Sequence, residues 1–197
     1  MIKFINNCED QPFRILRDKY NEALSSGQRS IEALAISSLS SDNEVESRFV
    51  NLKIVDGQEF IFFSNYNSPK STNFSYHDQI SALIYWNEIN IQIRIKAKIK
   101  RTSKKFNNEY FKQRSPEKNA LAISSNQSGR ISSYEKIVKN FNDIKGSQDL
   151  TKCPDYWGGF VFKPYDIEFW EGHRSRLNRR DHFKKNLDGW EHNILEP

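Results

Sequence analysis

Four arginines fall within seven residues near the carboxyl end of the chain, directly after an aromatic segment. That segment runs from Tyr156 to Trp170, Glu171-Gly172 follows as a turn, and the arginines are Arg174, Arg176, Arg179 and Arg180. Guanidinium groups hold phosphate or carboxylate through paired hydrogen bonds, while aromatic side chains offer a flat apolar wall. The stretch therefore favours a flat anionic ligand. A buried hairpin followed by a solvated basic segment explains the same residues equally well.

Two further places could contribute to an anion site. Tyr110 and Arg114 are four residues apart in a predicted helix at 107–114, so both side chains could reach one ligand. Lys70 lies near the start of another predicted helix that extends to residue 77, where free backbone amides help to hold an anion. By contrast, the lysines that alternate with isoleucines along 89–101 are interpreted as the solvated face of a strand.

The composition limits the possible classes of protein. The chain has 197 residues, 37% hydrophobic and 28% charged, which is typical of a globular domain, and its net charge of +5 favours phosphate-bearing partners. No apolar run approaches the ~18 residues of a membrane span, and the amino-terminal residues do not resemble a signal peptide. Cys8 and Cys153 are far apart and are expected to be free thiols in a reducing cytosol. The scattered histidines predict no metal site, and the dispersed basic residues predict no nucleic-acid partner.

The order of elements predicts a mainly β (α+β) fold. Besides the helices named above, the pattern predicts helices at 11–27 and 133–145 and strands at 33–39, 48–55, 60–64, 81–86, 89–101, 167–170, 181–185 and 190–195, with a further strand after Gly158-Gly159. Residues 116–119 are expected to form a loop, and 146–154 a linker. Short strands with hairpin turns such as Asp56-Gly57 favour a small antiparallel barrel with peripheral helices. We expect one domain over 1–197, with a helical segment at 1–29.

A series of short motifs adds a more specific indication. In order, they are RFVNLK at 48–53, FFSNYNSPK at 62–70, ALIYW at 82–86, IQIRIKAKI from 91, YFKQR from 110, SSNQSGRIS at 124–132, YWGGF at 156–160, IEFWEG at 167–172 and RLNRR at 176–180. Together they resemble the pyridoxamine 5′-phosphate oxidases, flavin enzymes of the FMN-binding split-barrel fold. The resemblance covers roughly residues 30 to 197 in one register, and no single motif would suffice.

This resemblance implies an FMN-dependent oxidase of vitamin B6 metabolism. Such an enzyme converts pyridoxamine or pyridoxine 5′-phosphate to pyridoxal 5′-phosphate, with hydride passing from C4′ to flavin N5 and dioxygen leaving as hydrogen peroxide. It also implies a homodimer with FMN at the subunit interface, in which residues 155–197 serve dimerisation and the active site. A cytoplasmic enzyme without membrane or nucleic-acid partners is expected.

The resemblance also assigns roles residue by residue. The positions that match FMN contacts are Arg48, Phe49, Val50, Lys53, Phe63, Ser64, Lys70, Gln92, Gln127, Ser128, Trp170 and Arg180. The positions that match substrate contacts are Lys53, Tyr110, Arg114, Lys118, Arg176 and Asn178, and the last two are the candidate catalytic residues.

Three positions depart from the family pattern. Pro69 stands where an arginine usually contacts the FMN phosphate, Lys118 replaces a serine near the substrate phosphate, and Asn178 replaces a histidine. Asparagine forms hydrogen bonds but does not titrate near neutral pH. Two alternatives therefore remain open. One is a related split-barrel oxidase acting on another substrate, as in phenazine assembly, and the other is a non-catalytic carrier of FMN or pyridoxal 5′-phosphate.

Overall fold

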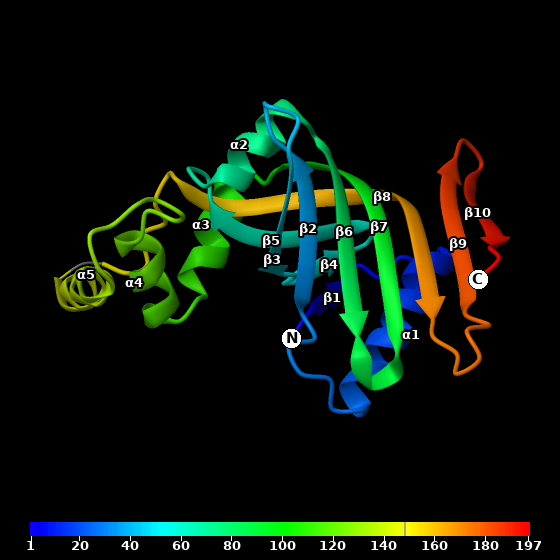
Figure 1. The fold of residues 1–197 in the computed structure, drawn as a ribbon. Coiled ribbons are helices and arrows are strands. Elements are labelled where there is room, and N and C mark those ends of the chain that lie inside the picture. Colours follow the sequence, from blue (N-terminus) through cyan, green and yellow to red (C-terminus); the bar gives the residue numbers. More distant parts are fainter. Residues whose placement is uncertain (148) are drawn as a thin grey trace.

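The structure, a computed structural model, describes residues 1–147 and 149–197, and within them ten strands form a single sheet (Figure 1). Along the main path the sheet order is β1-β4-β5-β8-β7-β6-β2-β3, and β9 and β10 extend from β8. The strands are β1 (Lys3–Ile5), β2 (Ala33–Leu39), β3 (Val45–Asn51), β4 (Ile54–Asp56), β5 (Glu59–Asn65), β6 (Gln79–Trp86), β7 (Ile91–Arg101), β8 (Trp157–Glu171), β9 (Arg179–Asn186) and β10 (Gly189–Ile194). All neighbours pair antiparallel except β1 and β4. The prediction of a split β-barrel with peripheral helices is confirmed.

The two residues between β3 and β4 close the sheet into a barrel. The amide of Leu52 donates to the carbonyl of Glu32 at 2.8 Å, just before β2, and the amide of Lys53 donates to the carbonyl of Ile61 on β5 at 2.9 Å. The chain therefore passes here from one end of the sheet path to the other. The sequence predicted one strand over 48–55. That prediction was wrong, because β3 pairs with β2 whereas β4 pairs with β5, and residues 52–53 join them.

Alternating side chains fill the barrel. The inward residues of β7, from Ile91 to Ile99, are all buried, whereas the lysines and the arginine between them are exposed, as the period of two predicted. Phenylalanines of β5 and β8 stack across the sheet, with ring centroids 5.1 Å apart for Phe60 and Phe162. Helix α1 (Gln11–Ser25) buries Phe13 and its neighbouring apolar residues against this core. Each such side chain contributes about 1.5–3 kcal/mol through burial.

Strand β8 is one element of 15 residues rather than the two strands that the sequence predicted. Its register with β7 shifts between Lys96 and Ala97, so that Pro164 and Asp166 pair on either side of an extra residue, Tyr165. A bulge tolerates proline because the ladder is already interrupted there, and the strand bends without ending. At its start, a Cβ on Gly158 would overlap the side chains of Tyr66 and Asn107, which explains the need for glycine.

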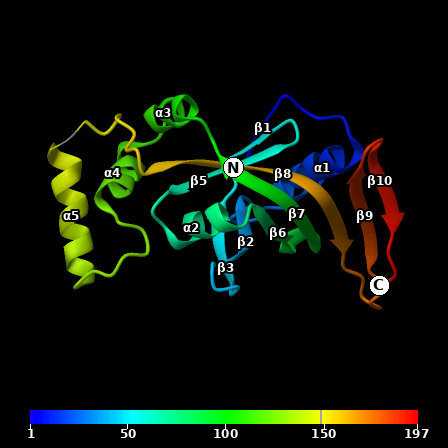
Figure 2. The same cartoon turned by 90° about the horizontal axis from the view of Figure 1, so that it is seen from above.

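The remaining helices lie mostly beyond one end of β8. They are α2 (Pro69–Tyr76), α3 (Lys104–Lys112), α4 (Pro116–Ser124) and α5 (Tyr134–Ser147), together with a short 3₁₀ turn, η1 (Asn87–Ile89). Figures 1 and 2 show α3, α4 and α5 at one end of β8, and β9 and β10 beside its other end. None of the described helices is both long enough and apolar enough to cross a bilayer.

Several helix boundaries differ from the prediction, and two of the differences bear on the candidate site. Helix α3 ends at Lys112, so Arg114 lies in the turn that follows rather than on the helix face. Residues 116–119, expected to form a loop, open α4, with Pro116 in the first turn, where its missing N–H is not needed. The expected linker at 146–154 begins inside α5, and its residue 148 lies outside the described residues.

Candidate functional site

A cavity of about 680 Å³ lies between the barrel and the helices beyond one end of β8. It takes side chains from β3, β5, β8, α2, α3 and α4 and from the segments between them. The lining residues are Glu32, Phe49, Val50, Asn51, Lys53, Phe63, Ser64, Lys70, Tyr110, Gln113, Arg114, Ser115, Lys118, Gln127 and Trp157. Ten of them were predicted as site residues, so strands and helices far apart in the sequence meet where the motifs indicated.

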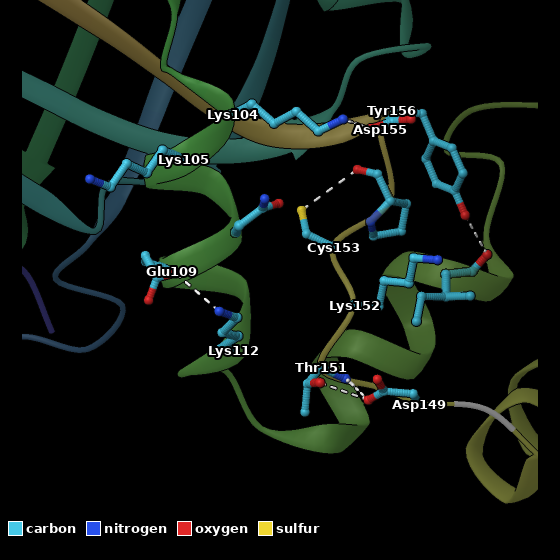
Figure 3. A pocket seen from close by; sticks show the side chains of 13 residues that line it. Lys104, Lys105, Glu109, Lys112, Asp149, Thr151, Lys152, Cys153, Asp155 and Tyr156 are labelled. Atoms are coloured by element: carbon cyan, nitrogen blue, oxygen red, sulfur yellow. Dashed lines mark hydrogen bonds and ion pairs between the residues drawn. The ribbon is translucent and has the colours of Figure 1, made fainter.

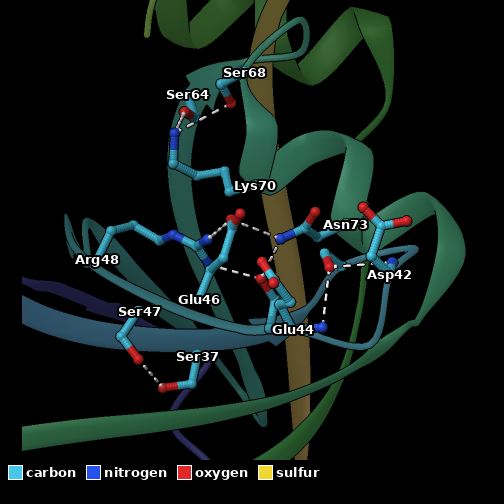
Figure 4. A network of polar contacts seen from close by, with 12 residues as sticks. Ser37, Asp42, Glu44, Glu46, Ser47, Arg48, Ser64, Ser68, Lys70 and Asn73 are labelled. Atoms are coloured by element: carbon cyan, nitrogen blue, oxygen red, sulfur yellow. Dashed lines mark hydrogen bonds and ion pairs between the residues drawn. The ribbon is translucent and has the colours of Figure 1, made fainter.

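Lys70 is the most buried cation of the cavity, with 6% of its surface exposed. It stands in the first turn of α2, and its Nζ donates to Ser64 Oγ and Ser68 Oγ, each at 3.1 Å (Figure 4). Within the described residues no carboxylate pairs with it. Burial, and secondarily the nearby Arg48, lowers the pKa of Lys70 to about 8. A buried ammonium held only by hydroxyls is suited to an anionic ligand.

Arg48 lies beside this lysine but is already paired. Its Nη2 is 2.7 Å from Glu46 Oε2, and its Nη1 donates to Ser38 Oγ at 2.6 Å. Asn73 donates to the same Glu46 oxygen at 2.9 Å, and Figure 4 shows this polar network next to Lys70. Burial lowers the pKa of Arg48, although the carboxylate opposes the shift. Arg48, a predicted FMN contact, therefore does not line the cavity, although its charge acts on Lys70.

Arg114 presents an unused donor. Its Nη2 donates to the carbonyl of Lys118 at 3.1 Å, and its guanidinium carbon lies 4.3 Å from the centre of the Trp157 ring. Its Nη1 is buried and has no hydrogen-bond partner among the residues that the structure describes. Buried donors without partners are rare in folded proteins and indicate a place for an unseen acceptor. Burial lowers the pKa of Arg114, yet arginine stays protonated at neutral pH.

An aromatic stack forms one wall of the cavity. The ring of Phe63 lies between Tyr110, whose centroid is 3.7 Å away, and Trp157, at 5.2 Å, and all three rings are nearly parallel. Burial raises the pKa of the Tyr110 hydroxyl. On the opposite side, Gln127 Oε1 accepts from Ser64 Oγ at 3.0 Å, which fixes the loop after α4 to β5. Flat apolar surface thus lies beside the cationic positions.

The other predicted residues form a second group at the far end of β8. Strand register places Gln92, Trp170 and Arg180 side by side on β7, β8 and β9. Arg180 is held by Glu168, with Nε 2.7 Å from Oε1. The exposed turn before β9 carries Arg176, with a left-handed backbone at φ 60°, and Asn178. Ser128 also lies outside the cavity, at the edge of a smaller hollow.

Asn178, predicted to be catalytic, has a partner within this turn. Its Oδ1 accepts a hydrogen bond from the backbone amide of His173 at 3.0 Å, and the amide of Arg176 donates to the carbonyl of His173 at 2.9 Å. Asn178 therefore holds the turn that presents Arg176. Its side-chain amide nitrogen has no hydrogen bond among the described residues.

The two groups do not meet within one chain. Trp157 lines the cavity and Trp170 belongs to the second group. Along β8 the two residues are roughly 43 Å apart. Figures 1 and 2 show the two ends of this strand on opposite sides of the barrel. The cavity thus contains only part of the predicted site.

Five lining residues were not predicted. They are Glu32, Asn51, Gln113, Ser115 and Trp157. Trp157 was inside the aromatic segment singled out from the sequence, and Gln113 and Ser115 flank Arg114, so proximity could have suggested them. Glu32 had no local signal, because it reaches the cavity only through the closure of the barrel at Leu52.

A larger hollow of about 1050 Å³ lies on the other side of α3 (Figure 3). Its charged side chains mostly neutralise one another, as in the pairs Lys104 with Asp155 at 2.7 Å and Lys112 with Glu109 at 3.0 Å. Burial raises the pKa of Cys153 to about 11, so this thiol is protonated at neutral pH and is a poor nucleophile. Among the described residues, no cluster of His, Cys, Asp or Glu is placed to hold a metal ion.

Comparison with known proteins identifies similar chains. Residues 157–197 match the family model of the pyridoxine 5′-phosphate oxidase C-terminal dimerisation region. The pyridoxine/pyridoxamine 5′-phosphate oxidase of Colwellia psychrerythraea is 33% identical over 188 residues, which cover 94% of this chain and 87% of that protein. The enzyme of the same name from Haemophilus influenzae is 30% identical, with 98% and 92% of the two chains covered.

Two solved structures share the fold. PhzG from Burkholderia lata, in complex with tetrahydrophenazine-1-carboxylic acid, superposes with a TM-score of 0.89 at 24% identity and covers 95% of this chain and 93% of its own. A pyridoxamine 5′-phosphate oxidase-related, FMN-binding protein from Nostoc punctiforme gives a TM-score of 0.77 at 12% identity, covering 92% and 97%. At these identities the superpositions establish the architecture alone.

Proposed function

The chain belongs to the pyridoxine/pyridoxamine 5′-phosphate oxidase family, and on that premise we propose that it is an FMN-dependent oxidase that converts pyridoxamine or pyridoxine 5′-phosphate to pyridoxal 5′-phosphate. One observation carries the proposal: a single cavity holds two buried cationic groups, Lys70 Nζ and Arg114 Nη1, that lack an anionic partner among the described residues. Two phosphate-bearing ligands in one cleft, a cofactor and a substrate, would satisfy both.

The cavity residues fit this pair of ligands. Lys70 with Ser64 would hold the FMN phosphate, and Arg114 with Tyr110 and Lys118 would hold the substrate phosphate. When bound, FMN would supply a hydride acceptor at N5 that dioxygen can reoxidise, with release of hydrogen peroxide. The protein then has to orient C4′ of the substrate towards that acceptor and exclude water, for which the Phe63 stack offers a rigid apolar wall.

A second copy of the chain would complete the site. We propose that residues 1–197 act as one domain and that 155–197 carries Trp170, Arg176, Asn178 and Arg180 to the partner's cavity across a homodimer interface. The match of 157–197 to a dimerisation region supports this arrangement. It also accounts for the separation of the two predicted groups along β8. Gln92 stands beside Trp170 and would join the same contact.

The outer face of the sheet supports the same arrangement. Phe49, Tyr85 and Leu83 are exposed there by 77%, 52% and 37%, and Ala35 pairs with both Phe49 and Leu83 across neighbouring strands. A contiguous apolar face of this kind usually marks a protein–protein contact. We expect Leu83→Lys to convert a dimer to a monomer in sedimentation velocity and to weaken flavin binding in parallel, because it would bury an unpaired charge in an apolar contact.

Leu24→Lys is the matched control for that variant, since Leu24 is a leucine of similar exposure, 42%, on α1. It should leave the sedimentation coefficient unchanged. A Leu83→Lys protein that stays dimeric with full flavin would place the subunit contact elsewhere on the molecule.

The reaction itself is tested by anaerobic reduction. Protein loaded with FMN is expected to lose its absorbance near 450 nm when pyridoxamine 5′-phosphate is added, to form pyridoxal 5′-phosphate, and to recover the band in air. A band that bleaches only with a non-phosphorylated tricyclic acid would instead support a phenazine-type oxidase. A flavin band that no amine or alcohol substrate bleaches would support a carrier, and failure to bind FMN would remove the proposal.

A further inference from the structure

Glu32 is the sole carboxylate among the described residues that line the cavity. It precedes β2, is partly buried, and its Oε1 lies 3.3 Å from Lys53 Nζ. Burial alone would raise the pKa of Glu32, but hydrogen bonds from its own backbone and from Lys53 lower it below the usual value. The cavity therefore contains a negative charge although it is otherwise suited to anions.

The barrel closure fixes this ion pair. The carbonyl of Glu32 accepts from the amide of Leu52, the residue before Lys53, so the two backbones are joined one residue from the paired side chains. The pair is thus set by main-chain geometry as well as by charge. Its effect is to draw the Lys53 ammonium to the β2 side and to offset part of its field in the cavity, although the same oxygen also lies 3.5 Å from the amino-terminal nitrogen of Met1.

This ion pair affects how strongly the cations of the cavity hold a phosphate group. Substrate and product of the proposed reaction carry the same phosphate, so an extra free cation would hold both equally. Such uniform binding lowers KM without raising kcat, and it slows product release. A carboxylate that restrains one of the cations therefore limits how tightly the product is held.

We propose that Glu32 is a positioning residue that acts through Lys53 to weaken the binding of phosphorylated B6 ligands, and so sets how readily the aldehyde product leaves. This inference rests on the proposed function. Glu32 touches neither reacting atoms nor flavin in this proposal, and its influence passes through the lysine that it holds.

The test is the affinity of FMN-loaded protein for pyridoxal 5′-phosphate, measured by calorimetry at fixed ionic strength. Glu32→Gln keeps the side-chain shape and is expected to tighten binding by about three- to tenfold, because it frees the Lys53 charge. Both kcat and KM for pyridoxamine 5′-phosphate should fall together if product release limits turnover. Glu117→Gln is the matched control, since Glu117 lies on α4, pairs with Lys145 and does not line the cavity. It should leave the affinity unchanged.

A double-mutant cycle with Lys53→Met tests the route of the effect. In the Lys53→Met background the Glu32→Gln substitution is expected to change the affinity by less than about twofold, since the lysine through which it acts is gone. Unchanged or weaker binding by Glu32→Gln overturns the inference, and so does an undiminished effect without Lys53. If these results occur while the wild-type protein binds and oxidises its substrate, only the role of Glu32 fails. Wild-type protein that binds FMN but not pyridoxal 5′-phosphate would overturn both proposals.

Discussion

Replacing Lys70 with methionine is expected to give a folded protein that purifies without flavin. Methionine is of similar length and fills the buried position without a charge, so the fold should tolerate it. The variant loses a desolvated, charge-assisted hydrogen bond to the FMN phosphate, worth roughly 2–4 kcal/mol, or about 30- to 1000-fold in affinity. Titration of flavin-free protein with FMN, followed by quenching of flavin fluorescence, measures the loss.

Lys163→Met provides the matched control, because Lys163 is an exposed lysine on the same barrel, in the middle of β8. It should bind FMN as the wild type does. Normal flavin affinity in Lys70→Met would show that the phosphate is held elsewhere, and the assignment of this lysine would be wrong.

The lowered pKa of Lys70 also makes the expected FMN affinity depend on pH. In the empty protein it is lowered to about 8 from 10.5, so FMN affinity should fall as pH rises through 8, and binding near that pH should take up a proton. Between pH 8 and pH 10.5, Lys70 is mostly protonated in the unfolded chain and mostly neutral in the folded protein without flavin, so the unfolded state binds more protons. The stability of the empty protein therefore rises with pH in this window, relative to Lys70→Met. Thermal unfolding from pH 7 to 10 measures the difference.

The second large effect is expected from Arg114→Gln. Glutamine retains a donor for the Lys118 carbonyl but removes the charge and the free Nη1. We expect kcat/KM for pyridoxamine 5′-phosphate to fall about 100-fold or more, which corresponds to roughly 3 kcal/mol, while flavin content stays near that of the wild type. Steady-state kinetics and the absorbance ratio of flavin to protein give the two values.

Arg101→Gln is the control for the loss of an arginine stacked on an aromatic ring. The Arg101 guanidinium carbon lies 4.3 Å from the Tyr66 ring centre, the same separation as in the pair of Arg114 and Trp157, but outside the cavity. Its kinetics should resemble the wild type. Equal loss of flavin and activity in Arg114→Gln would mean that this arginine binds the cofactor instead of the substrate.

Local patterns predicted the fold well where one face of an element is buried. The alternation in β7 and the boundaries of β2 were confirmed, because a period of two with a turn at each end leaves little choice. Strand β8 was divided wrongly at Pro164, since a proline in an isolated pattern ends a strand, whereas the bulge at Tyr165 lets the pairing continue. That bulge depends on pairing with β7, which lies about 70 residues away in the sequence. The pattern of nearby residues alone therefore cannot predict it.

The arrangement of the candidate site could be predicted less well from the sequence than the fold could. Tyr110 and Arg114 share the cavity as expected, although α3 ends between them. The motif series, however, gives no distances, and so it joined in one site residues that lie at opposite ends of β8. Glu32 was missed because its place beside Lys53 follows from the contact of its backbone with Leu52. The roles assigned to individual residues stay predictions.

Because the barrel closes at residues 52–53, next to the cavity, the stability of the barrel is linked to ligand binding. Among the described residues, three main-chain hydrogen bonds hold this short seam: from Leu52 to Glu32, from Lys53 to Ile61, and from Lys3 to the carbonyl of Lys53. Local fluctuations of a protein usually begin where few bonds must break. Any separation of the seam displaces Lys53 and Glu32 together, so the binding cavity loses its shape at the first step of barrel opening. Ligand in the cavity therefore opposes that step, so that ligand affinity and the integrity of the barrel depend on the same few main-chain hydrogen bonds.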